Sequence, residues 1–103
     1  MKVSNMVSSK GNKVANQFVI ADCFIDLSKN GEYGESRGDM FQSYDSNICF
    51  ISYDTGHKQI YLDKNYWDYS VTTGKYRNMF LGETKKETEK KIKSGEYKLV
   101  DLN

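Results

Sequence analysis

The sequence of 103 residues provides for a single domain with one modest core, because chains of this size bury roughly 60 to 70% of the surface that they expose when unfolded. A hydrophobic fraction of 38% and a net charge of +1 are typical of a globular protein, and they exclude binding to nucleic acid or to a membrane through overall charge. Two cysteines are too few for a disulfide framework. The sequence contains no run of about 20 apolar residues, which is the length needed to cross a bilayer. No apolar leader follows Met1-Lys2, so we expect a cytoplasmic protein with free thiols and no membrane contact.

Side chains that alternate between two faces with a period of two predict four strands in the first two thirds of the chain. Ile48 and Phe50, for example, fall on the face opposite Cys49. Three glycines and very few apolar side chains predict a long, flexible loop at residues 28–38. The four strands are predicted at residues 14–20, 40–44, 47–53 and 58–62.

Helical spacing replaces this alternation after residue 65 and predicts a first helix, which Ser70 or Thr72 can cap and Gly82 can end. Four side chains spaced by three or four residues share one face of it, namely Tyr69, Thr73, Tyr76 and Phe80.

A second helix is predicted from Thr84, which forms a capping box with Glu87, to Gly95, and a last strand at residues 97–102. We therefore expect an α+β fold in one domain over residues 1–103. It contains a small antiparallel sheet of about five strands and two helices near the C-terminus, in the order β-β-β-β-α-α-β.

Motifs that would support catalysis are weak in this sequence. Asp54-Thr55-Gly56 matches the triplet of aspartic proteases, but Ser52-Tyr53 before it and His57-Lys58 after it do not fit that family, so a hairpin turn is predicted. His57 is the only histidine, which argues against a histidine zinc site and against a Ser-His-Asp triad. Cys23 and Cys49 are predicted to be buried, unreactive thiols. We expect no enzymatic activity, no cofactor and no metal.

Residues 66–81 combine rings for stacking, cations for an anion and several groups that can hydrogen bond. Such a mixture can hold a nucleotide, a nucleic-acid strand or a protein partner. The alternative is that Trp67, Tyr69, Tyr76 and Phe80 are core residues and that the charges are solvated. The predicted binding residues are Tyr66, Trp67, Tyr69, Thr72, Thr73, Lys75, Tyr76, Arg77 and Asn78.

Five segments together resemble a family of small proteins of unassigned function found in phages and prophages of Firmicutes. They are VANQF at 14–18, FQSYDS at 41–46, WDYS at 67–70, TTGKYRN at 72–78 and FLGE at 80–83. The resemblance implies a genetic setting and no mechanism.

Phage accessory proteins of this size are often inhibitors of host defence. We therefore expect a counter-defence protein of the anti-CRISPR type, which binds a host defence protein such as a nuclease effector stoichiometrically. Two alternatives stay open: a module that binds or sequesters a nucleotide or nucleic acid, and a structural or assembly protein of the phage particle.

Overall fold

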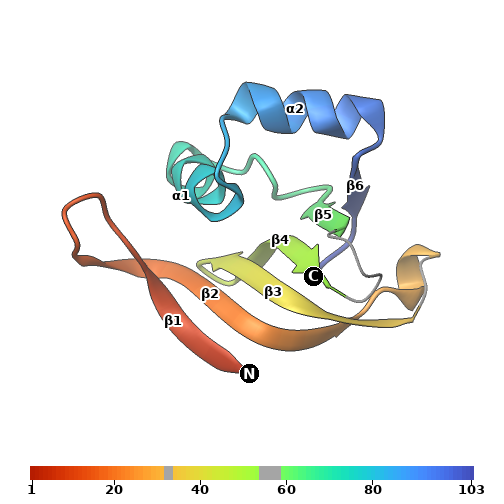
Figure 1. Cartoon of the computed structure of the whole chain (residues 1–103), viewed down its shortest axis with the longest axis horizontal. Helices are drawn as coiled ribbons and strands as arrows, with labels where there is room; N and C mark the ends of the chain where they lie inside the picture. Colours follow the sequence, from red (N-terminus) through yellow and green to blue (C-terminus); the bar gives the residue numbers. More distant parts are fainter. Residues whose placement is uncertain (32–33, 54–58) are drawn as a thin grey trace.

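The computed structural model describes residues 1–31, 34–53 and 59–103. These described residues form one six-stranded sheet. The strands are β1 (Lys2–Val7), β2 (Lys13–Asp26), β3 (Glu35–Ser43), β4 (Ser46–Ser52), β5 (Gln59–Asp63) and β6 (Tyr97–Val100). Their order in the sheet follows the chain, from β1 at one edge to β6 at the other (Figure 1).

Two helices connect β5 to β6, and this crossover makes β5 and β6 parallel while all other neighbouring strands are antiparallel. The first is α1 (Val71–Leu81), where the Ser70 hydroxyl accepts a hydrogen bond from the amide of Thr73. The second is α2 (Lys85–Ser94), which starts with the predicted capping box between Thr84 and Glu87. The helix boundaries, including the glycines that end both helices in the left-handed conformation, are confirmed.

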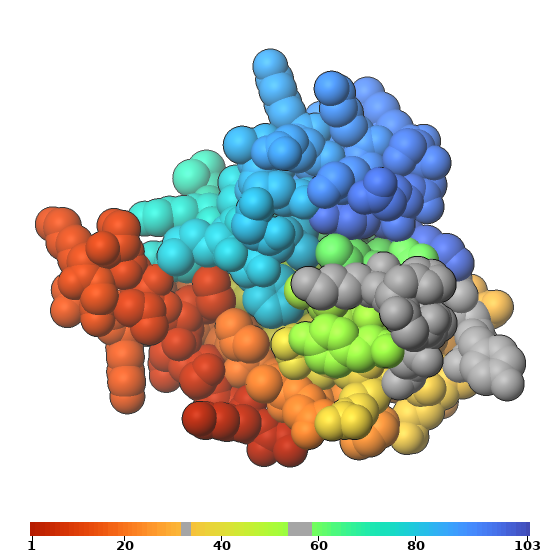
Figure 2. Space-filling model, viewed as in Figure 1, coloured from red at the N-terminus to blue at the C-terminus, as the bar shows by residue number. Residues whose placement is uncertain are grey.

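The sheet carries apolar residues on both faces, and the helices cover only one of them (Figures 1 and 2). Met40 and Phe41 are adjacent in β3 and point to opposite faces, so they belong to different clusters. The cluster under the helices contains Met6, Phe41, Ile48, Cys49, Leu62, Tyr76 and Tyr97. The cluster on the other face contains Cys23, Leu27, Met40, Phe50, Tyr61, Val100 and Leu102.

The last three residues close the second cluster, because they cross from β6 to β4 and to the 3-10 turn η1 (Ser28–Asn30). The Asn30 side chain exchanges two hydrogen bonds with the backbone of Asp101, at 2.9 and 3.0 Å. The Asn47 amide group donates to the carbonyl of Leu102 at 2.9 Å. The buried Leu102 side chain is held against the sheet in this way.

Three predictions about the sheet are wrong. There are six strands in the described residues instead of five, because β1 was missed, and the sheet is mixed instead of antiparallel. The strand predicted at 14–20 extends to Asp26, because pairing with β3 resumes after a bulge at Asp22, whose φ is 55°. The strands predicted at 40–44, 47–53 and 97–102 are confirmed with shifted ends.

The predicted loop at 28–38 is largely structured, because η1 begins it and β3 starts at Glu35. The first half of β3 is polar, so alternation could not reveal it. Its backbone pairs with β2, and the Ser36 and Ser52 hydroxyls form a buried hydrogen bond of 2.6 Å. Residues 32–33, the turn predicted at Asp54-Thr55-Gly56 with His57, and the first residue of the strand predicted at 58–62 lie outside the described residues.

Candidate functional site

The turn that leads into α1 is held by the buried carboxylate of Asp63, which is 0% exposed. One oxygen accepts hydrogen bonds from the amides of Asn65 and Tyr66, at 3.0 and 2.9 Å. The other accepts from the amide of Leu102 at 2.8 Å, so the turn is tied to the C-terminal segment. Residues 66–70 therefore enter α1 from a fixed position.

Arg77 lies in the interior instead of on the predicted binding surface, with 1% of its surface exposed. Its Nη1 donates to the carbonyl oxygen of Trp67 at 2.6 Å and lies 3.4 Å from Asp68 Oδ1. Its Nη2 donates to Asn78 Oδ1 at 3.0 Å, and the guanidinium lies 5.2 Å from the centre of the Trp67 ring. Arg77 thus joins the loop before α1 to the helix, and a partner at the surface cannot contact it broadly.

Two further predicted binding residues are core residues. Thr73 is 0% exposed, and its hydroxyl lies 2.9 Å from that of Ser43 on β3. Tyr76 is buried in the cluster under the helices. Phe80, on the same face of α1, stacks on Phe41 with ring centres 5.8 Å apart. Thr73, Tyr76 and Phe80 therefore lie on the inward face of α1, as predicted.

Tyr69, which was grouped with that inward face, is exposed at 60% and precedes the helix. Its ring meets Tyr66 edge to face at 5.6 Å. Tyr66 and Trp67 are half-buried and pack against the core. The core interpretation thus holds for Tyr76 and Phe80 and does not hold for Tyr69.

An exposed stripe runs along the outer side of α1, and we call it the α1 stripe. Val71 is 92% exposed and Met79 is 44% exposed, and Lys75 lies between them with a spacing of four residues to each. Val71 and Met79 were not among the predicted binding residues, although their i, i+8 spacing around Lys75 could have revealed them. The stripe consists of Tyr69, Val71, Thr72, Lys75 and Met79.

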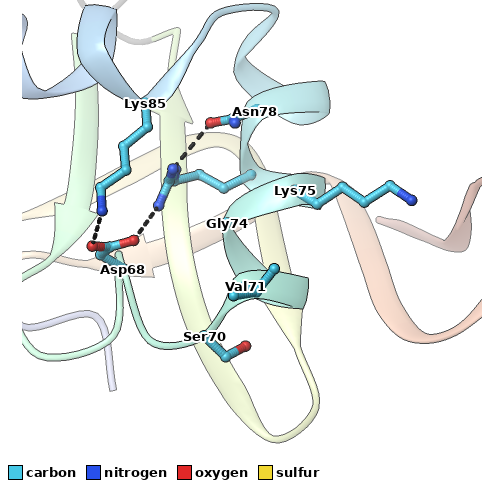
Figure 3. A pocket seen from close by; sticks show the side chains of 8 residues that line it. Asp68, Ser70, Val71, Gly74, Lys75, Asn78 and Lys85 are labelled. Atoms are coloured by element: carbon cyan, nitrogen blue, oxygen red, sulfur yellow. Dashed lines mark hydrogen bonds and ion pairs between the residues drawn. The ribbon is translucent and has the colours of Figure 1, made fainter.

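A cleft lies beside the stripe, where the loop before α1 meets the first turns of both helices (Figure 3). It has a volume of about 600 Å³. Its lining comes from the loop (Asp68, Ser70), from α1 (Val71, Gly74, Lys75, Arg77, Asn78) and from α2 (Lys85). The cleft therefore contains three of the predicted binding residues, Lys75, Arg77 and Asn78, and one residue, Lys85, that was not among them.

Charge in the cleft centres on Asp68, whose two oxygens lie 2.7 Å from Lys85 Nζ and 3.4 Å from Arg77 Nη1. Burial raises the pKa of Asp68, but hydrogen bonds and charge from Lys85 and Arg77 lower it by more, so the net shift is downward. The carboxylate is consequently ionised at neutral pH, and it faces two cations. Lys75 extends away from them at the rim (Figure 3).

A separate polar cluster under α2 is structural. Glu83 Oε1 accepts from Tyr97 at 2.6 Å and from Lys91 at 2.9 Å, and its Oε2 accepts from Thr88 at 2.5 Å. Burial and the hydrogen bond to Glu83 raise the pKa of Tyr97 to about 12. All four groups are satisfied by one another, so this cluster offers nothing to a ligand.

The two cysteines carry no site chemistry. Cys23 and Cys49 are free and buried, as predicted, and burial raises the pKa of the Cys49 thiol far above its usual range. Within the described part of the chain, no group of three or more His, Cys, Asp and Glu side chains is placed to hold a metal. Neither helix there has the length and apolar character needed to span a membrane.

Residues 1–96 match a family model described as "Family of unknown function (DUF8033)". Neither a curated protein nor a solved structure matches the chain.

Proposed function

Because the chain belongs to this family of unknown function, whose description names no activity, we propose from the geometry alone that it is a binding protein that acts on a protein partner through the α1 stripe. The partner that we propose is a host defence protein, such as a nuclease effector. The binding is stoichiometric, and the protein counters host defence in the manner of an anti-CRISPR inhibitor.

The observation that carries this proposal is the apolar surface left on the outer side of a well-capped helix. Tyr69, Val71 and Met79 are 60%, 92% and 44% exposed, respectively. Burying a side chain of this kind is worth about 1.5–3 kcal/mol, so a partner that covers all three gains several kcal/mol. Rigid aromatic and apolar side chains on a fixed element are the usual anchors of protein interfaces.

The charges around the stripe indicate the chemistry of the partner. Lys75 lies within the stripe, and no acidic residue occurs in the first turn of α1. The positive end of the helix dipole therefore adds to the charge of Lys75. We expect the partner to present an apolar groove with acidic residues at its rim.

We further propose that the protein comes from phages or prophages of Firmicutes and acts in the cytoplasm of an infected host. It is supported by the resemblance of the five segments named above. Two of these segments, at 67–70 and 72–78, contain Tyr69, Thr72 and Lys75 of the stripe.

The test is reconstitution of a complex from purified proteins, with affinity measured for matched variants. Tyr69→Ala and Met79→Ala should each weaken binding by about tenfold or more, which corresponds to about 1.4 kcal/mol or more. Phe24→Ala is the control, because Phe24 on β2 is 62% exposed, about as much as Tyr69, and lies outside the α1 stripe. Equal losses for Tyr69→Ala and Phe24→Ala would show that the stripe is not the interface.

Inhibition is tested separately, by adding the protein to the captured effector in increasing ratios. We expect nuclease activity to end near one equivalent and to persist with the Tyr69→Ala variant. Catalytic amounts of the protein that abolish activity would contradict a stoichiometric inhibitor.

A second candidate function, binding of a nucleotide, is favoured by one observation, the cationic cleft beside the stripe. Salt separates the two candidates. Affinity for a phosphate group falls steeply as ionic strength rises, whereas an apolar interface loses little.

A further inference from the structure

We propose that the cleft between the first turns of α1 and α2 binds the phosphate group of a small organic phosphate of nucleotide size. This site is separate from the protein interface, although Val71 and Lys75 border both. The phosphate would lie between Lys85 and the start of α1, above the Arg77 guanidinium.

The first argument is the charge that surrounds one carboxylate. Arg77 and Lys85 both face Asp68, so the three groups that meet in the cleft carry a net charge of +1. Lys85 is half-exposed, with 50% of its side chain accessible, and can turn from Asp68 toward a ligand. Lys85 would donate a charge-assisted hydrogen bond to the phosphate, while Arg77, which is buried and bonded to Trp67 and Asn78, would contribute its charge.

The second argument is the unusual placement of Arg77. The guanidinium is 1% exposed and already oriented by Trp67 and Asn78, so no entropy is lost in ordering it. Its Nε lies buried without an acceptor among the described residues, so protein groups do not saturate it. The protein interior between its charge and the cleft screens that charge less than water would.

The third argument is Gly74, which forms the floor of the cleft above the guanidinium. A Cβ at this position would lie 3.6 Å from Arg77 Nη2 and 3.8 Å from Nη1. Any larger side chain would occupy the space directly over the guanidinium. Glycine in the interior of a helix costs about 0.5–1 kcal/mol relative to alanine, and here it keeps the cleft open.

The fourth argument is the N-terminus of α1. The Ser70 hydroxyl satisfies the amide of Thr73, while the amides of Val71 and Thr72 have no acceptor within the helix. No acidic side chain in the first turn competes for them. Free amides at a helix start bind phosphate, and Val71, which carries one of them, lines the same cleft as Lys85 and Arg77.

The size of the cleft decides between inorganic phosphate and a larger ligand. Its volume of about 600 Å³ lies within the range of sites for small organic molecules, about 300–1,000 Å³. A phosphate alone would leave most of it empty. The remaining space borders Val71, which is apolar, so the rest of the ligand is expected to be an organic group.

The test follows backbone amide signals by NMR while adenosine monophosphate, inorganic phosphate, acetate or adenosine is added to the full chain. We expect saturable shifts at Ser70, Gly74 and Lys85 with adenosine monophosphate, weaker binding of inorganic phosphate, and none with acetate or adenosine. Binding of acetate as tight as that of phosphate would overturn the assignment of a phosphate site. Absence of saturable shifts with both phosphates would overturn the proposal.

Two variants with opposite expected effects make the test specific. Lys85→Gln should weaken binding of adenosine monophosphate by about fivefold or more, because one charge-assisted hydrogen bond is lost. Asp68→Asn should tighten it by about threefold or more, because a carboxylate that competes with the phosphate is neutralised. Lys90→Gln is the matched control, since it removes the same charge from the exposed side of α2. Equal losses for Lys85→Gln and Lys90→Gln would overturn the proposal.

The two proposals fail separately. Tyr69→Ala should leave the affinity for adenosine monophosphate unchanged, because Tyr69 does not line the cleft. If the protein partner binds and the phosphate does not, only this inference is wrong. If the phosphate binds while no interface forms on the stripe, only the proposed function is wrong.

Discussion

Arg77 contacts Trp67 twice, through a hydrogen bond of 2.6 Å to its carbonyl oxygen and through its ring, whose centre lies 5.2 Å from the guanidinium. The hydrogen bond fixes the backbone of the loop at Trp67, and the ring contact fixes the Trp67 side chain beside the guanidinium. Arg77 therefore helps to fix the loop that supplies Tyr69 to the stripe and Asp68 and Ser70 to the cleft.

Arg77→Met should lower the free energy of unfolding by about 2–4 kcal/mol, because the Trp67 carbonyl loses its donor and the ring its cation. Urea unfolding measures the change. Lys75→Met is the control, since it removes the same charge from an exposed position on the same helix, and its effect should stay within about 0.5 kcal/mol. Similar losses for both variants would contradict a structural role for Arg77.

Asp63→Ala should lower the free energy of unfolding by about 3 kcal/mol or more, because the buried amide of Leu102 and the partly buried amides of Asn65 and Tyr66 lose their acceptor. Asp63→Asn keeps the shape and one acceptor oxygen, so its loss should be smaller. Equal stability of Asp63→Ala and the wild type in urea would show that the turn is held by other groups.

Two glycine substitutions should have opposite effects on stability. A Cβ at Gly38 would lie 1.9 Å from the carbonyl oxygen of Ile51, so Gly38→Ala forces the backbone of β3 and β4 apart and should cost about 3 kcal/mol or more. Gly74→Ala meets only ordinary contacts and should raise stability by about 0.5–1 kcal/mol through helix propensity. Thermal unfolding distinguishes the two.

Gly74→Ala carries a second expectation, since it narrows the proposed phosphate site while it stabilises the fold. A variant that is more stable and yet binds adenosine monophosphate less tightly would separate the site from the scaffold. Tighter binding by Gly74→Ala would contradict the role given to this glycine.

Protonation of Glu83 should contribute to the loss of stability in acid. Burial raises the pKa of Glu83, but hydrogen bonds from Thr88, Tyr97 and Lys91 lower it by more, so the folded value lies below the ordinary 4.5. The unfolded chain therefore takes up the proton at a higher pH than the folded chain does. The contribution of Glu83 is complete above pH 4.5 and is lost as the pH falls through the folded value.

The measurement compares urea midpoints of the wild type and Glu83→Gln across this range. The difference between them should be largest near neutral pH and shrink below pH 4.5. Other carboxylates also titrate there, but they are common to both proteins. A difference that is constant with pH would show that Glu83 is not the group responsible.

Local chemistry was sufficient to predict both helices from the chain. Ser70, Thr84 and Glu87 satisfy amides within three residues of themselves, and Gly82 and Gly95 end the helices through their own φ angles. Such signals act over one turn and need no partner from elsewhere. The alternation predicted in β4 is only partly right, because the register with β3 shifts at Ile48: Ile48 packs with Cys49 in the cluster under the helices, and Phe50 lies in the other cluster.

The strands that were missed or shortened depend on distant partners. Half of the side chains of β1 are polar and the first half of β3 has no apolar side chain, and both are strands because β2 offers its backbone to both. The parallel pairing of β5 with β6 likewise depends on where the two helices return the chain. The hydrogen bonds between strands join main-chain groups, so the side-chain pattern of a strand does not reveal them.

The candidate site likewise has one part that the sequence predicts and one part that depends on tertiary packing. Spacing along a helix correctly placed Thr73, Tyr76 and Phe80 on one face, because the helix period sets those directions. Whether Arg77 lies in water or in the core depends on the Trp67 carbonyl and on Asp68, which the turn at Asp63 brings to it. The meeting of Lys85 with Asp68 depends on how two helices pack. Periodicity within one helix carries no information about either contact, since both join groups that only the folded sheet brings together.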